Sequence, residues 1–153
     1  MYARDHGGIA TPIGTVAIEL EQGALARVTI GGAVSRGTSA LAIEALRQLE
    51  AWFAGERRDF DLPLAPVPTP RGAELRAGLV AVGYGETLSY GALAKRLGSS
   101  ARAIGQLCAR NPLPIVVPCH RVLGANGVLG HYSAGEGSAT KAWLIAHERG
   151  ESR

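Results

Sequence analysis

Residues 89–110 read SYGALAKRLGSSARAIGQLCAR and predict two short helices joined by a tight turn. Ser89 can cap the first helix, Gly98 can end it, and Ser99 or Ser100 can cap the second. Two short helices around a turn with glycine form the helix-turn-helix pattern. Short helix pairs are common in proteins, so the pattern permits DNA binding without establishing it.

The second predicted helix, over 101–110, has an unusual surface for a DNA reader. A helix that reads the major groove presents long polar side chains to base edges. Here most side chains are small and the charges are arginines: Ala101, Ala103, Gly105 and Ala109, with Arg102 and Arg110. Small residues favour close approach to a minor groove, where an arginine could wedge into the base stack. The structural alternative is a helix packed on the core, with Arg102 merely solvated.

Upstream of this pair, the prolines between residues 62 and 71 mark a boundary. Positions 63, 66, 68 and 70 are all proline, which favours an extended linker and blocks a helix or a central strand. We therefore divide the chain into domains 1–69 and 70–153. A helix from Pro70 to about Val82 is predicted to open the second domain.

The N-terminal domain reads as a small α/β layer. Two strands, 14–20 and 25–30, are predicted around a hairpin turn. Apolar residues then recur at helical spacing up to Phe53, with Thr38 or Ser39 as the cap and Gly55 at the end. Nothing in this half suggests chemistry.

Composition excludes several classes of protein. The chain has 153 residues, of which 46% are hydrophobic, so bulk disorder is excluded. No run approaches the ~20 apolar residues of a membrane span, and residues 1–10 lack the apolar core of a secretory signal. These features predict a soluble, intracellular protein. The net charge of +3 permits an anionic partner. Two cysteines, Cys108 and Cys119, cannot form a disulfide framework, and their spacing without a second pair disfavours a zinc cluster.

The candidate chemistry follows the second helix. The β-branched run 115–117 is predicted to be a buried strand that leads into Pro118-Cys119-His120-Arg121. A cysteine beside a histidine at the end of such a strand is a candidate nucleophile. Neighbouring side chains of an extended chain point to opposite faces, so proton exchange needs a bend or a bridging water. The alternative is a structural cysteine beside a core histidine.

Pro118-Cys119-His120-Arg121 resembles the signature of the O6-alkylguanine-DNA alkyltransferases, also called methylated-DNA–protein-cysteine methyltransferases. Five further segments resemble that family in order and spacing: Tyr84–Ala94, Ala101–Gly105, Asn111–Val117, Tyr132–Ser133 and Lys141–Glu148. The resemblance is weaker upstream, in Thr11–Gly14 and Trp52–Glu56.

The resemblance implies an α/β fold with a small ribonuclease-H-like N-terminal domain and a C-terminal helix-turn-helix, winged-helix-like domain that carries the cysteine. It implies direct, irreversible, single-turnover transfer of an alkyl group from O6-alkylguanine in double-stranded DNA, after base flipping through the minor groove. It implies no cofactor, no metal and no membrane, and a monomer in the cytoplasm that acts on chromosomal DNA.

The resemblance also implies roles for residues at the reacting centre. The Cys119 thiolate would attack the alkyl carbon, His120 would take the thiol proton through a bound water, and Glu148 would orient His120. Tyr90 would donate to N3 of the departing guanine, and the loop of Ser133 would donate to O6. The backbone carbonyls of Cys119 and Val122 would accept from the guanine amino group.

Around that centre, Asn111 resembles the family's buried hinge asparagine, which holds the turn between the second helix and the cysteine segment. Arg102 would intercalate in place of the flipped base, with Ala101 and Gly105 in the minor groove. Cys108 is expected to be a core residue. The loop 134–140 departs from the family's shorter Gly-Gly-containing loop.

Three other functions compete with alkyl transfer. A lesion-binding relative would recognise alkylguanine without transfer, but such proteins carry another residue at the position of Cys119. A thiol hydrolase could use Cys119 and His120, although the helix-turn-helix would then have no role. A DNA-binding regulator would need a further domain.

Overall fold

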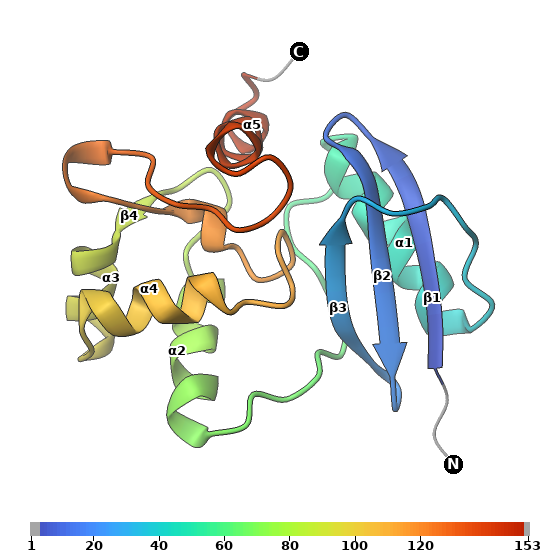
Figure 1. The fold of residues 1–153 in the computed structure, drawn as a ribbon, viewed down its shortest axis with the longest axis horizontal. Helices are drawn as coiled ribbons and strands as arrows, with labels where there is room; N and C mark the ends of the chain where they lie inside the picture. The colour runs from blue at the N-terminus through green and yellow to red at the C-terminus, as the bar shows by residue number, and fades with distance from the viewer. Residues whose placement is uncertain (1–3, 152–153) are drawn as a thin grey trace. The chain divides into compact units, whose positions relative to one another are not determined.

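The computed structural model describes residues 4–151, so the first three residues of the segment considered for a signal peptide lie outside it. The chain forms two compact units, Met1–Ala65 and Pro66–Arg153. The first unit combines one helix with a small sheet and the second combines several helices with a two-stranded pairing, which gives a mixed α/β fold (Figure 1).

The first unit contains an antiparallel sheet in the order β1-β2-β3, formed by Arg4–Thr11, Gly14–Glu21 and Ala24–Ile30. The hairpin predicted from the sequence is the β2–β3 pair. Strand β1 was not predicted, because Gly7 and Gly8 interrupt its apolar alternation. A Cβ on Gly7 would lie 2.7 Å from Cδ1 of Leu46, so the glycine allows close packing of the helix on this strand.

Helix α1, Ala40–Phe53, packs against β1 and β2 and covers one face of this sheet (Figure 1). Its N-cap is Ser39, whose hydroxyl accepts from the backbone N–H of Ala42 at 3.1 Å. The apolar residues of the helix and the sheet form the core of the unit: Val16, Ile18, Leu20, Leu25, Val28, Ala42, Ala45, Leu46, Leu49 and Trp52.

The elements of the second unit are α2 (Pro70–Val80), β4 (Leu88–Ser89), α3 (Tyr90–Leu97), α4 (Ala101–Ala109), the 3-10 turns η1 (Cys119–Arg121) and η2 (Ala125–Gly127), β5 (Val122–Leu123) and α5 (Ser138–Glu148). Helices α2, α3 and α4 begin at hydroxyl side-chain caps. The hydroxyl of Ser89 accepts from Ala92 N–H, and Gly98 ends α3 with a left-handed φ of 62°. Ser100 caps α4, which settles the choice between Ser99 and Ser100.

A two-residue parallel pairing joins β4 to β5 and places the chain after Cys119 beside the start of α3. Helices α3 and α4 pack on each other (Figure 1). No helix within residues 4–151 combines the length and the apolar character needed to cross a bilayer.

The run 115–117 is not a strand, which corrects the sequence prediction. The N–H of Val116 donates to the carbonyl of Pro114 at 2.9 Å, in a γ-turn centred on Ile115, whose φ is 75°. A second γ-turn at Pro118, with φ −83° and ψ 63°, brings Cys119 N–H within 2.8 Å of the Val117 carbonyl. A left-handed β-branched residue is strained, so tertiary contacts must hold this segment against its local preference for a strand.

Candidate active site

Cys119 begins the turn η1 directly after the second γ-turn, and only 4% of it is exposed. Its Sγ accepts a hydrogen bond from Nδ2 of Asn111 at 3.3 Å. The same amide group donates to the Val117 carbonyl at 3.0 Å, and its Oδ1 accepts from Leu113 N–H at 2.9 Å. Asn111, predicted as a hinge, thus bonds three points of the turn segment.

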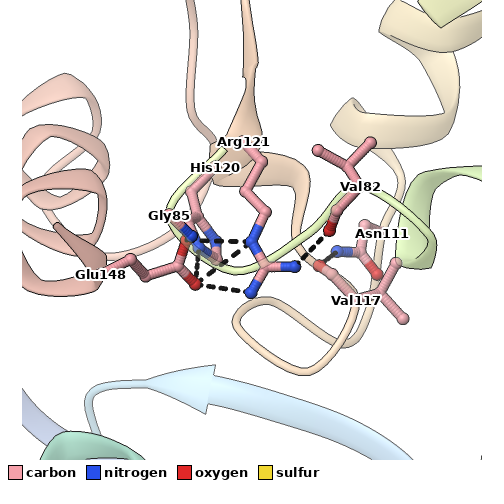
Figure 2. Close-up of polar contacts among 7 residues, drawn as sticks. All are labelled: Val82, Gly85, Asn111, Val117, His120, Arg121 and Glu148. Atoms are coloured by element: carbon pink, nitrogen blue, oxygen red, sulfur yellow. Dashed lines mark hydrogen bonds and ion pairs between the residues drawn. The ribbon is translucent and has the colours of Figure 1, made fainter. Parts of the chain in front are cut away.

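A polar network lies on one side of the cysteine segment (Figure 2). The Glu148 carboxylate lies 2.9 Å from Nε2 of His120. It also accepts from Nε of Arg121 at 2.9 Å and from Nη2 at 2.7 Å. The N–H of Gly85 donates to it at 3.3 Å, and Nη1 of Arg121 donates to the Val82 carbonyl at 2.6 Å. The network therefore joins α5, the cysteine turn and the loop after α2.

The electrostatics of this network determine which nitrogen of His120 is basic. Burial opposes ionisation of Glu148, but hydrogen bonds from His120 and Arg121 outweigh it and lower its pKa to about 2. Because the carboxylate is ionised at neutral pH, Nε2 of His120 carries the proton and donates. Burial lowers the pKa of His120, so the ring is neutral at neutral pH, with its lone pair on Nδ1.

Arg121 compensates an unfavourable position of Glu148. Glu148 is the last residue of α5, where the helix carbonyls already concentrate negative charge. A buried carboxylate there needs a cation, and Arg121 supplies it with 7% of its own surface exposed. The charges of Arg121 and Glu148 cancel, and the buried His120 beside them is neutral.

On the other side, Cys119 lines a cavity of about 260 Å³. Its walls come from α3, α4 and the loop before α5: Tyr90, Gly105, Cys108, Ala109, Cys119, His131, Tyr132 and Ser133. Cys108, expected in the core, is half-buried and faces this cavity, because it follows Gly105 by three residues on the same face of α4. Cys108 and Cys119 thus line the same cavity.

Lys141 adds a buried positive charge near the cavity. Its Nζ lies 3.4 Å from the carbonyl of His131 and 5.7 Å from the centre of the Tyr90 ring. Burial lowers the pKa of Lys141, and the charges of the two thiols act in the opposite direction. The hydroxyl of Tyr132 is buried and finds no hydrogen-bond partner within residues 4–151.

The structure does not bring all the predicted site residues together. Tyr90 and Ser133 line the cavity with Cys119, whereas His120 and Glu148 belong to the network. Val122 is fully buried in β5 and is not among the cavity-lining residues of the described chain. On α4, the side chains of Ala101 and Arg102 are exposed, and Gly105 faces the cavity.

Three residues near the centre were not predicted as functional, although the sequence holds signals for them. Arg121 stands inside the Pro-Cys-His-Arg segment. Lys141 is one of two lysines in an arginine-rich chain, and it lies seven residues before Glu148, on the same helix face. Cys108 lies three residues after Gly105. Within residues 4–151, no group of three or more His, Cys, Asp or Glu side chains is arranged to hold a metal ion.

Comparisons with known proteins all indicate the same family. The sequence model for the 6-O-methylguanine DNA methyltransferase, DNA binding domain, matches residues 74–150. The constitutive methylated-DNA–protein-cysteine methyltransferase of Bacillus subtilis is 39% identical over 91% of this chain and 92% of its own length. The enzyme of that name from Methanosarcina acetivorans is 50% identical, over 60% of this chain and 60% of its own length.

Solved structures agree with these matches. The crystal structure of Mycobacterium tuberculosis OGT in complex with DNA superposes with a TM-score of 0.81 at 34% identity, over 96% of this chain and 94% of that one. The structure of an O6-methylguanine DNA methyltransferase from Methanococcus jannaschii superposes with a TM-score of 0.61 at 27% identity, covering 93% of this chain and 92% of that one. This chain therefore belongs to the 6-O-methylguanine DNA methyltransferase family, whose curated members are methylated-DNA–protein-cysteine methyltransferases.

Proposed function

We propose that this protein repairs O6-alkylguanine in double-stranded DNA by one irreversible transfer of the alkyl group to Cys119. The observation that carries the proposal is that Cys119 lines an open cavity and is followed directly in η1 by His120, which belongs to a buried polar network. Family membership supports the same reaction. The thioether that forms is stable, so each molecule acts once.

In the proposed reaction, the thiol of Cys119 must lose its proton before attack, because the thiolate is the nucleophile. His120 accepts that proton at Nδ1 through a bound water, and the ionised Glu148 keeps its Nε2 protonated and its ring oriented. This arrangement follows the nucleophile, base and orienting acid of hydrolases, with water as a spacer.

The departing guanine gains negative charge, which the cavity walls can stabilise. We propose that Tyr90 donates to N3 and that the loop of Ser133 donates to O6; both residues line the cavity. The backbone carbonyls of Cys119 and Val122 are proposed to accept from the guanine amino group. Valine has no polar side-chain atom, so only the backbone of Val122 can take this role.

DNA engagement is proposed to use α3 and α4 as a helix-turn-helix in a winged-helix-like domain, residues 70–153. O6 of a paired guanine cannot reach a buried thiol, so the base must flip out of the duplex. The exposed Arg102 would fill the vacated space while Ala101 and Gly105 lie in the minor groove. A Cβ on Gly105 would meet open space, so close approach to a ligand is sterically possible there.

The remaining features are proposed from family likeness alone. Domain 1–69 would be a structural unit of reduced ribonuclease-H-like type. The protein would act as a monomer on chromosomal DNA in the cytoplasm.

Intact-protein mass spectrometry after incubation with an O6-methylguanine duplex tests the reaction. We expect a gain of one methylene mass per protein, mapped to Cys119, and none in Cys119→Ser. A gain mapped elsewhere would contradict the assignment of the nucleophile. No gain, with retained binding to the modified duplex, would favour lesion recognition without transfer, and loss of the label with continued turnover would favour a thiol hydrolase.

The DNA-binding proposal has a separate test. Arg102→Ala should slow repair of the duplex far more than reaction with free O6-benzylguanine, because only the duplex requires base flipping. Arg110→Ala, at the other end of the same helix, is the matched control for loss of one positive charge. Equal losses on both substrates would remove the intercalation role.

A further inference from the structure

An exposed histidine stands at the mouth of the cavity that holds Cys119. His131 lines this cavity, yet its side chain is exposed to solvent. Two more of the lining residues are exposed, Ala109 on α4 and Ser133 in the loop before α5. Of these three side chains, only the imidazole can carry a positive charge. The proposed reaction uses the loop of Ser133 and gives His131 no role.

The backbone at His131 is tied to two helices. Its carbonyl lies 3.4 Å from Nζ of Lys141 on α5. The preceding Gly130 has a left-handed φ of 75°, and a Cβ there would lie 3.6 Å from the same Nζ and 3.7 Å from Cε2 of Tyr90 on α3. The next residue, Tyr132, is buried. The exposed imidazole therefore projects from a backbone that packs against α3 and α5.

Base flipping determines which part of the DNA comes to this rim. A flipped nucleotide places its base in the cavity, but its phosphates remain outside, because they join it to the rest of the strand. Phosphate oxygens accept most of the hydrogen bonds that position a protein on DNA, and positive charge strengthens these contacts. A phosphate beside the flipped nucleotide thus comes to the exposed lining residues, where His131 offers an N–H donor.

Other titratable groups stand on each element around the rim. They are Tyr90 on α3, Cys108 on α4, Cys119 in η1, Lys141 on α5, and Tyr132 and Glu136 in the loop of His131. Burial raises the pKa of both tyrosines, so their hydroxyls stay neutral near pH 7. The charge of Lys141, next to the His131 carbonyl, attracts an anion to the same place. It also repels a second positive charge, but water screens this repulsion at an exposed imidazole.

We propose that His131 binds DNA at the rim of the cavity, where its imidazole donates a hydrogen bond to a phosphate beside the flipped nucleotide. This inference rests on the proposed alkyl transfer after base flipping. The contact is stronger when the imidazole is charged, because a charge-assisted hydrogen bond is about twice as strong as a neutral one. His131 thereby holds the strand at the mouth of the cavity while the base lies beside Cys119.

Single-turnover rates at pH 6 and pH 8, below DNA saturation, test this role, because histidine ordinarily gains its charge near pH 6.5. His131→Asn keeps a polar side chain that cannot become charged. On an O6-methylguanine duplex we expect it to react about 10-fold more slowly than the unmodified protein at pH 6, and less than about 3-fold more slowly at pH 8. On free O6-benzylguanine, which has no phosphate, we expect equal rates at both pH values.

The ratio of the two rates at each pH removes the pH dependence of the transfer step itself. His6→Asn is the matched control, because His6 is also exposed and lies outside the residues that the DNA-binding family model matches. This control should match the unmodified protein on both substrates.

A change in the DNA locates the contact. A methylphosphonate in place of a phosphate beside the modified guanine removes its negative charge, and each flanking phosphate is replaced in turn. At one position the replacement should abolish the deficit of His131→Asn at pH 6, because the contact is already lost. Binding to the duplex, measured with Cys119→Ser in both proteins to prevent transfer, gives a second readout. The plot of log affinity against log salt should be less steep by about 0.9 without the His131 contact.

Three outcomes would overturn the proposal. Equal duplex rates at pH 6 would mean that His131 contacts nothing that matters for repair. An equal loss on the duplex and on the free base would mean that His131 only shapes the cavity. A loss of the same size at both pH values, with unchanged salt dependence, would place the side chain against the base or the sugar. Failure of the proposed function is distinguishable, because the unmodified protein would then transfer no alkyl group to Cys119 from either substrate.

Discussion

The two sides of Cys119 differ in how completely their polar groups are bonded. On the network side, the Glu148 carboxylate accepts from His120, from Arg121 and from the backbone of Gly85. On the cavity side, the sulfurs of Cys119 and Cys108 face open space and the charge of Lys141. The difference teaches that the network side fixes the arrangement of charges. The cavity side leaves room beside the Cys119 thiol for a reactant.

Removal of Arg121 should break the network side most severely. Arg121→Met retains much of the side-chain volume but leaves Glu148 as a buried charge at a helix C-terminus. We expect a loss of about 3–5 kcal/mol in the free energy of unfolding, typical when one partner of a buried pair is removed. Denaturant unfolding measures it, with exposed Arg149→Met as the control. An unchanged stability would mean that Arg121 is not the compensating cation.

Glu148→Gln should change how stability depends on pH. The folded-state pKa of about 2 lies below the ordinary 4.5, so the stabilisation by Glu148 is fully present above pH 4.5 and is lost as the pH falls toward 2. The variant should lose roughly 3 kcal/mol at pH 7 and should lack this acid-dependent part. It should also transfer alkyl groups more slowly, because His120 loses its orienting carboxylate.

Urea unfolding at a series of pH values measures this effect, with the exposed Glu151→Gln as the control. Parallel pH curves for Glu148→Gln and the unmodified protein would contradict the assignment of the low pKa. An unchanged transfer rate would reduce Glu148 to a structural charge.

Asn111→Ala should affect both sides, because Asn111 bonds the turn segment and the Cys119 sulfur. The change leaves the Leu113 N–H and the Val117 carbonyl without this partner, for a cost of about 1–3 kcal/mol. The variant should also transfer more slowly, since the thiolate loses one donor. A stability loss with a normal transfer rate would confine Asn111 to the hinge role.

Lys141→Met should have the smallest effect on stability and should sharpen the picture of the cavity. Loss of a buried charge offsets loss of its contacts, so we expect a change within about 1 kcal/mol. The pKa of Cys108 should rise in an ultraviolet titration of the thiolates, because the nearby cation is gone. Lys95→Met, which changes the chain's other lysine on an exposed part of α3, is the control. An unchanged thiolate titration would show that the charge of Lys141 does not lower the pKa of either cysteine.

Sequence alone determined the features that depend on a few consecutive residues. Ser89 and Gly98 predicted the ends of α3, because capping bonds close within four residues. The contiguous Pro-Cys-His-Arg segment supplied the candidate nucleophile. Strand β1 was not predicted, because Gly7 permits close packing on α1 and thereby interrupts the alternation of apolar and polar residues that marks a strand. Local signals also predicted a strand at 115–117, where the structure has turns.

Tertiary structure alone decided the chemistry around the cysteine. The left-handed Ile115 is held by surrounding contacts that local preference cannot foresee, and Asn111 is part of them. Glu148 meets Arg121 across 27 positions of the chain. Cys108 reaches the cavity because α4 turns it there. Charge compensation acts through space, so it appears only when the fold has brought these distant residues together.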